Sequence, residues 1–212
     1  IKGGVNFMGR KSALGCFHPA EAVLVDPVFL ASLPTAHLRT GLAEIAKIAM
    51  IRDPELFAML EAHGAELIGS AFQSPVDTGR EILWLALEGM CAELEPNLFE
   101  TRYRRMVDFG HSFSNLLEPA SGYRIRHGEA VAVDMAFCAA LSAEMGLIEV
   151  AERDRIWSLL AGMGLPLHVP ELTLALLEEA LIRAEAHRAG SVNLIVPDGI
   201  GATRVIVDRS EL

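Results

Sequence analysis

The sequence is poor in positive charge, in paired cysteines and in long apolar runs. Its 18 Lys and Arg stand against 28 Asp and Glu, a formal net charge of −10, which argues against a nucleic-acid binder because that class needs a basic face. The three cysteines form no CxxC pair and no plausible disulfide framework, so we expect a reducing, cytoplasmic setting. No apolar run approaches the roughly 20 residues of a membrane span and no signal peptide is visible, so no membrane partner is expected.

Apolar residues, in contrast, make up 51% of the 212 residues, and a sizeable core is expected. They recur every three or four positions through most of the chain after residue 34, which predicts helices. The predicted helices cover residues 36–51, 54–72, 79–94, 111–119, 127–147, 150–163 and 171–187. Residues 22–26 are predicted to form a short buried strand, and two apolar runs around residues 197–199 predict a hairpin. The chain is thus predicted to be mainly α, with a few short strands.

The opening stretch, IKGGVNFMGRKSALG, has the composition of a loop already under way, and its first residue is not Met. We therefore expect the chain to begin with the end of a preceding domain and to continue, from residue 27, as one helical domain. No GxGxxG or similar phosphate-binding glycine cluster follows a strand in this sequence.

Three side chains form a candidate metal site. Glu44 shares a helix face with Lys47 among apolar neighbours, while His111 and His127 each adjoin a glycine near a predicted helix start. Glu/His/His is a common ligand set for catalytic zinc and leaves one position open. Two alternatives stay open at this point: a partly exposed salt bridge between Glu44 and Lys47, and two histidines buried for structural reasons.

A second group of candidate residues is cationic. It comprises Lys2, Lys11, Lys47 and Arg104, with His187 near the end of the chain. If these side chains converge, they would suit a phosphorylated, polyhydroxylated substrate. Singly, each would be an ordinary surface charge.

Four segments, in their order and spacing, together resemble the sugar phosphate cyclases, the 3-dehydroquinate-synthase-like family. They are IKGGVNFMGRKSALG, FLASLPTAHLRTGLAEIAKIAMI, RRMVDFGHSFSNLLE and HGEAVAVDMA, and the resemblance covers essentially the whole chain. In this family a Rossmann-like N-terminal domain binds NAD, and a helical C-terminal domain holds a divalent metal, usually zinc or cobalt. The resemblance implies that residues 1–26 end the NAD-binding domain, with the interdomain active-site loop, and that residues 27–212 form the metal- and substrate-binding domain. It also implies that the complete enzyme is a homodimer acting on a small phosphorylated sugar.

The same resemblance implies a role for each matched residue. The metal ligands would be Glu44, His111 and His127. The catalytic residues would be Lys47, Lys2, Arg104 and Asp108. The substrate-binding residues would be Lys11, Leu94, Asn115 and His187. The NAD-binding residues would be Lys11, Ser12, Phe29, Ser32 and Leu33.

Within the family, Asp108, Leu94 and His187 resemble the 2-epi-5-epi-valiolone synthases. These cyclise sedoheptulose 7-phosphate with elimination of phosphate, a carbon–oxygen lyase reaction. Asn115, where these enzymes usually have Pro, and Ser12, where they usually have Asn, depart from the pattern. The 2-epi-valiolone synthases and 3-dehydroquinate synthases therefore remain alternatives. So do a metal-dependent polyol dehydrogenase and, for this chain alone, an inactive fragment or a metal-binding subunit.

Overall fold

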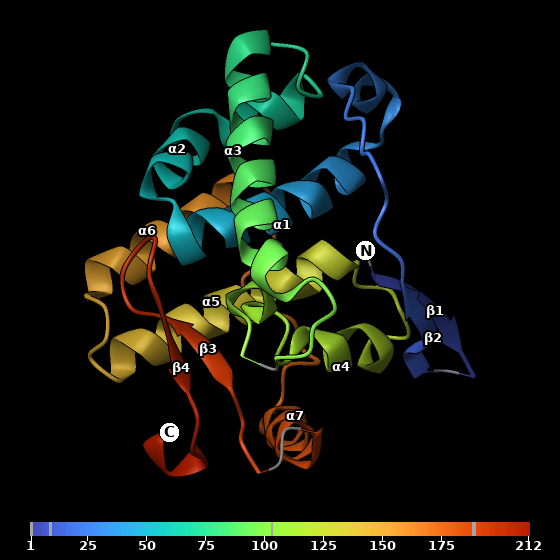
Figure 1. The fold of residues 1–212 in the computed structure, drawn as a ribbon. Coiled ribbons are helices and arrows are strands. Elements are labelled where there is room, and N and C mark those ends of the chain that lie inside the picture. Colours follow the sequence, from blue (N-terminus) through green and yellow to red (C-terminus); the bar gives the residue numbers. More distant parts are fainter. Residues whose placement is uncertain (1, 9, 103, 188–189) are drawn as a thin grey trace.

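The computed structural model describes residues 2–8, 10–102, 104–187 and 190–212, without the side chains of residues 2, 6 and 10–12. Over these ranges the chain forms seven α-helices and two antiparallel two-stranded sheets (Figure 1). The helices are α1 Thr35–Arg52, α2 Pro54–Gly69, α3 Val76–Leu94, α4 Ser114–Ala120, α5 His127–Glu144, α6 Val150–Gly162 and α7 Leu174–His187. The strands are β1 Lys2–Phe7, β2 Arg10–Phe17, β3 Leu194–Pro197 and β4 Thr203–Ile206. The 3-10 helices are η1 Pro27–Ser32, η2 Glu95–Asn97, η3 Met106–Asp108 and η4 Arg209–Glu211. The predicted fold class is confirmed.

Helix α5 is the central element of the core. It contacts α1, α4, α6 and β3 (Figure 1). Residues 130–136 are all buried, so almost two turns of this helix are covered on every side. The sequence AVAVDMA explains this, because a helix that is apolar all round is stable only inside a protein.

Helix α1 packs beside α5 and also contacts α2 and α3. It ends at Arg52. The next residue, Asp53, caps α2: its carboxylate accepts hydrogen bonds from the backbone N–H of Glu55 (3.1 Å) and Leu56 (2.9 Å). Pro54 occupies the first position of α2, where its missing N–H is not needed. The helix restart predicted at Asp53-Pro54 is therefore confirmed, and it folds α2 back onto α1.

The predicted hairpin near the end of the chain is also confirmed. Strands β3 and β4 pair in antiparallel register, Leu194 opposite Ile206 and Pro197 opposite Thr203. Strand β3 is wholly buried and packs against α5. The N–H of Gly201 in the turn donates to the carbonyl oxygen of Met50 at 3.0 Å, which joins the hairpin to the end of α1.

Two predictions for the N-terminal stretch are wrong. The stretch IKGGVNFMGRKSALG is expected as a loop, but residues 2–7 and 10–17 form the β1–β2 hairpin, because their backbone groups pair with each other and need no core. Residues 22–26, expected as a buried strand, form no strand, and Val23 and Leu24 are 78% and 96% exposed. No described strand pairs with this run, and an apolar run becomes a strand only where it has a pairing partner and a surface to cover it.

One helix boundary matters for the site. The helix predicted over residues 111–119 begins only at Ser114, so His111 lies in the connection between η3 and α4. Gly110 has a φ of 73°, a left-handed conformation that a continuous helix does not permit. Among the described helices, none is long and apolar enough to cross a membrane.

Candidate metal centre

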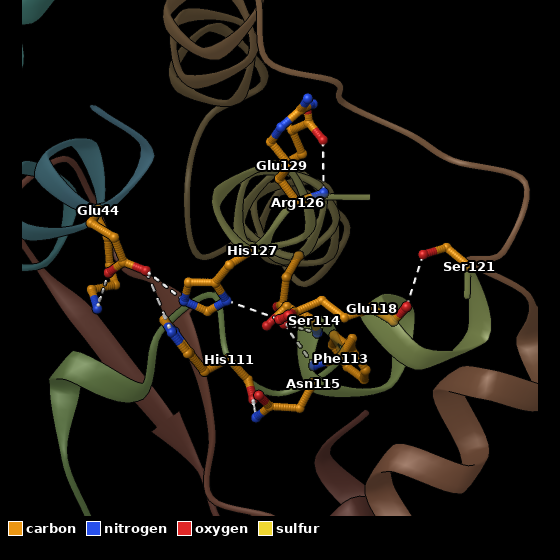
Figure 2. Close-up of polar contacts among 12 residues, drawn as sticks. Glu44, His111, Phe113, Ser114, Asn115, Glu118, Ser121, Arg126, His127 and Glu129 are labelled. Carbon is orange, nitrogen blue, oxygen red and sulfur yellow. Dashed lines mark hydrogen bonds and ion pairs between the residues drawn. The ribbon is translucent and has the colours of Figure 1, made fainter. Parts of the chain in front are cut away.

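Three separate elements bring Glu44, His111 and His127 together (Figure 2). Glu44 projects from the middle of α1, His111 from the connection before α4, and His127 from the first position of α5. One ligand atom from each residue lies within 4.8 Å of the other two. The Oε1 atom of Glu44 lies 3.1 Å from Nε2 of His127 and 3.5 Å from Nε2 of His111.

The two glycines beside the histidines permit this convergence. A Cβ atom on Gly128 would lie 2.4 Å from the carbonyl oxygen of Thr40, one turn before Glu44, so only glycine lets α5 approach α1 this closely. A Cβ atom on Gly110 would lie 2.9 Å from the side chain of Val131 on α5. In each Gly/His pair, the glycine lets the backbone approach a neighbouring helix closely, and the histidine side chain points to the site.

The outer nitrogen of each imidazole has a hydrogen-bond acceptor as its partner. Nδ1 of His127 lies 2.9 Å from Oε1 of Glu118, and Nδ1 of His111 lies 3.1 Å from the carbonyl oxygen of Phe109. Because both partners are acceptors, they assign the proton to Nδ1 in each neutral imidazole. The Nε2 lone pairs then face Oε1 of Glu44. A carboxylate or carbonyl behind a histidine in this way is the usual second shell of a metal site.

This arrangement fits a divalent metal ion. Oε1 of Glu44 is buried and accepts no hydrogen bond. Three electron-rich atoms that face one another repel unless a cation lies between them. Tetrahedral bonds of about 2.0–2.1 Å would place ligand atoms about 3.3 Å apart, close to the separations from Oε1 to the two Nε2 atoms. The set of one carboxylate and two imidazoles is typical of catalytic zinc and leaves a position for substrate.

The other oxygen of Glu44 is bound by a buried lysine. Nζ of Lys47 lies 2.6 Å from Oε2 of Glu44, and Lys47 is only 4% exposed. Burial alone would raise the pKa of Glu44, but the ammonium of Lys47 at Oε2 acts in the opposite direction, and the pKa lies well below its usual range. Burial, with Lys47 next, lowers the pKa of His111. Both shifts favour the unprotonated forms that a metal ion requires.

A cavity of about 1270 Å³ begins at His111 and runs between α4 and α7. Asn115 and His187, both predicted to bind substrate, line it together with Arg183. The side-chain amide of Asn115 donates to the carbonyl oxygen of His111 at 2.9 Å. The structure therefore places these two predicted residues in one cavity with a candidate metal ligand.

A second cavity, of about 750 Å³, contains Leu94, predicted to bind substrate, and Arg104, predicted to be catalytic. Leu94 and Arg104 line it beside Arg102, Arg105 and Asn193. Arg104 is exposed, and within the described part of the chain it forms no ion pair. Its guanidinium is accordingly available for an anion entering this cavity.

Asp108 is half-buried and bound by an arginine. Nη2 of Arg105 lies 2.6 Å from its Oδ1, and Nε of Arg105 lies 3.1 Å from its Oδ2. Arg105 also pairs with Glu100. Two neighbouring carboxylates, working against burial, raise the pKa of Arg105. The backbone N–H of His111 donates to the carbonyl oxygen of Asp108 at 2.9 Å, so this ion pair stands at the base of the His111 connection.

The predicted NAD-binding residues lie apart from these cavities. Phe29, Ser32 and Leu33 are exposed on or beside η1, where the hydroxyl of Ser32 donates to the carbonyl oxygen of Phe29 at 3.1 Å. The side chains of Lys2, Lys11 and Ser12 lie outside the described part of the structure.

Two carboxylates that support the site were missed by the sequence reasoning. Glu118 holds His127, and Asp134 accepts hydrogen bonds from the N–H groups of Phe113 and Ser114. Each is an acid within an apolar run, seven residues after a candidate histidine. That is the same signal that drew attention to Glu44, and it could have identified both.

The fold agrees with what known proteins show. The chain belongs to the 3-dehydroquinate synthase C-terminal family, whose family model matches residues 41–185. It is 46% identical over 211 residues to a 2-epi-5-epi-valiolone synthase of an Actinoplanes species, which covers 98% of this chain and 53% of the relative. A second enzyme of that name, from Streptomyces hygroscopicus subsp. jinggangensis, is 44% identical over 215 residues, covering 99% of the chain and 52% of the relative. The chain thus spans about half the length of the curated relatives it matches.

A solved structure supports the same relationship. The 2-epi-5-epi-valiolone synthase from Streptomyces hygroscopicus subsp. jinggangensis, with NAD⁺ and Zn²⁺ bound, superimposes with a TM-score of 0.94 at 42% sequence identity. The match covers 99% of this chain and 58% of that one. The family resemblance predicted from the sequence is confirmed.

Proposed function

We propose that this chain is the metal- and substrate-binding part of an enzyme that cyclises sedoheptulose 7-phosphate to 2-epi-5-epi-valiolone with elimination of phosphate. The observation that carries the proposal is the convergence of Glu44, His111 and His127, with Oε1 of Glu44 buried and without a hydrogen bond. The identity of 46% to a synthase of that name, over nearly the whole chain, supports the choice of reaction.

The proposal includes a division of the chain. Residues 1–26 would end an NAD-binding domain and form the loop between domains, and residues 27–212 would form the helical domain. The side chains of Val23, Leu24 and Phe29 are 76–96% exposed. This supports the division, because large apolar side chains with such exposure suit a surface that another domain covers. NAD would contact Phe29, Ser32 and Leu33, with Lys11 and Ser12. The complete enzyme would be a homodimer.

When bound, NAD accepts and returns a hydride, and the divalent metal polarises a substrate oxygen. The chain's own residues would prepare the pocket for this. Lys47 holds Oε2 of Glu44, so that Oε1 stays directed at the two imidazoles. Its buried ammonium also adds positive charge where negative charge develops on the substrate.

The cations would bind the phosphate and steady the open-chain sugar. Arg104 offers an exposed guanidinium in the same cavity as Leu94. Lys2 and Lys11 would act from the loop between the domains; with Lys47 they are all the lysines in the sequence. Asp108 would be presented to the substrate by Arg105, and Asn115 and His187 would line the part of the pocket next to His111.

The test is an assay of the complete protein with sedoheptulose 7-phosphate, NAD⁺ and Zn²⁺ or Co²⁺. We expect phosphate and a cyclitol to appear in equal amounts without net NADH. His127→Ala should abolish phosphate release, whereas His168→Ala, an exposed histidine in a loop, should leave it unchanged. No phosphate release by the wild-type protein would refute the proposal, and net NADH from a simple alcohol would indicate a polyol dehydrogenase.

The 2-epi-valiolone product is a second candidate, favoured by one residue. Asn115 lines the cavity at His111, where a different side chain could alter how the open-chain intermediate folds before ring closure. NMR of the cyclitol distinguishes the two stereoisomers, and release of phosphate only from the precursor of 3-dehydroquinate would indicate that third reaction instead.

A further inference from the structure

Asp134 lies in the middle of α5, seven residues after His127, and it is fully buried. Its Oδ2 atom accepts hydrogen bonds from the backbone N–H of Phe113 at 2.6 Å and of Ser114 at 2.9 Å. Its Oδ1 atom lies 3.5 Å from Sγ of Cys138. The backbone N–H of Ser112 also hydrogen-bonds to this carboxylate. No ion pair of Asp134 occurs among the described residues, so its partners are backbone amides and a thiol.

The amides of Phe113 and Ser114 are at the start of α4. The first N–H groups of a helix have no partner within the helix, and α4 has no side-chain cap from its own N-terminal residue. Asp134 therefore caps α4 from another helix. The residues it fixes are next to the candidate site: His111 is two residues before Phe113, and Glu118, which holds His127, is four residues after Ser114.

Burying the carboxylate of Asp134 is energetically unfavourable, and filling the core does not require an acid at this position. Its neighbours in residues 130–136 are apolar and buried, and a buried carboxylate without a cationic partner is unfavourable. Burial accordingly raises the pKa of Asp134 to about 6. What the carboxylate provides in return is an acceptor for N–H groups at the start of α4, so the acid serves the connection to α4 and not the stability of α5 alone.

We propose that Asp134 is a positioning residue of the metal centre. By holding the start of α4 on α5, it sets the His111 connection and Glu118 at a fixed place relative to His127. One helix then carries both a ligand and the anchor of the other histidine. The inference rests on the proposed metal-binding function and deepens it, because it names a residue that shapes the ligand geometry without touching the ligands.

The experiment titrates the full 212-residue chain with Co²⁺ and records the visible absorption of the bound ion. Asp134→Leu removes the acceptor and leaves two buried N–H groups without a partner. We expect Co²⁺ affinity to fall about 10–100-fold, with a changed absorption band. Asp134→Asn can present its carbonyl oxygen to both amides, so affinity within about threefold of wild type and an unchanged band are expected. Ser142→Ala is the matched control, since Ser142 is buried on the same helix and its hydroxyl has no hydrogen bond.

Equal affinity and equal spectra for wild type and Asp134→Leu would overturn the inference while leaving the proposed function intact. Failure of the wild-type chain to bind Co²⁺ would instead refute the proposed metal site, and the inference with it. If Asp134→Leu does not fold, amide hydrogen exchange in the wild-type chain decides. Slow exchange at Phe113 and Ser114 is expected, whereas exchange as fast as in an unfolded peptide would overturn the inference.

Discussion

The N-terminal stretch (residues 2–8 and 10–33) and the helical body (the described residues from 35 onward) are both rich in apolar side chains, but they use them differently. In the N-terminal stretch Met8 is 86% exposed and Phe29 is 76% exposed. In the helical body Phe57 and Phe109 are fully buried. Apolar side chains become buried only where the same chain supplies a surface that covers them. The helices of the helical body cover one another, whereas the apolar side chains of the N-terminal stretch stay exposed.

The two regions also differ in what holds them together. The β1–β2 hairpin is held by backbone pairing and makes a small contact with α4. The helical body is held by close side-chain and backbone packing, with the candidate metal centre at the junction of α1, α4 and α5. Four predictions test whether stability and metal binding belong to the helical body alone.

The largest effect is expected from Gly128→Ala. The new Cβ would lie 2.4 Å from the carbonyl oxygen and 2.5 Å from Cα of Thr40, and backbone atoms cannot move aside by changing a rotamer. We expect the free energy of unfolding, measured with urea, to fall by about 3 kcal/mol or more. Co²⁺ affinity should fall as well, because α1 and α5 carry two of the candidate ligands.

Gly15→Ala creates the same clash in the other region. Its Cβ would lie 2.3 Å from the carbonyl oxygen of Gly3 across the hairpin. If the helical body is stable without the hairpin, Gly15→Ala distorts the hairpin while the urea midpoint of the helical body stays unchanged. An equally large loss of stability in Gly15→Ala and Gly128→Ala would show that the two regions fold as one unit.

The second prediction concerns pH and the buried acid of the helical body. The pKa of Asp134 rises from 3.8 to about 6 on folding, so the folded chain binds more protons than the unfolded chain between these values. The stability of the wild type relative to Asp134→Asn should be highest below about pH 4 and should fall as the pH rises through 6, by at most about 3 kcal/mol. Urea unfolding of both proteins in EDTA at several pH values measures this difference. A difference that does not change with pH would contradict the expectation.

The third prediction concerns Glu118, where a substitution tests metal binding separately from stability. Glu118→Gln keeps the shape of the side chain but weakens the hydrogen bond to Nδ1 of His127. We expect Zn²⁺ affinity to fall about 10–100-fold, equivalent to about 1.4–2.8 kcal/mol, from competition with a chelating dye. Glu61→Gln, which alters a surface pair with Arg155, should bind Zn²⁺ like the wild type. If both variants bind equally well, Glu118 does not support a ligand.

The sequence predicted the helical body well because most of its helices have apolar residues every three or four positions, which neighbouring helices cover, and because α5 is a long apolar run that is stable only when buried. It also indicated the three candidate ligands, since a carboxylate and two histidines in apolar surroundings need a reason to be there. It failed for residues 22–26, whose apolar composition does not reveal whether a partner strand exists. It also placed His111 in a helix, because the left-handed turn at Gly110 and the cap from Asp134 depend on contacts between distant segments.

The smallest effect is expected when residues 1–26 are deleted. This removes the hairpin and residues 18–26, whose large apolar side chains are mostly exposed. It also removes Asp26, the N-cap of η1, but it leaves the helical body intact. The free energy of unfolding should change by less than about 0.5 kcal/mol, the range typical of surface changes, and Co²⁺ affinity should stay within about threefold. Catalysis by the complete protein should nevertheless be lost if Lys2 and Lys11 act on the substrate. A truncated chain that unfolds or loses Co²⁺ would show that the small contact between β2 and α4 stabilises the site, and that the helical body is not self-sufficient.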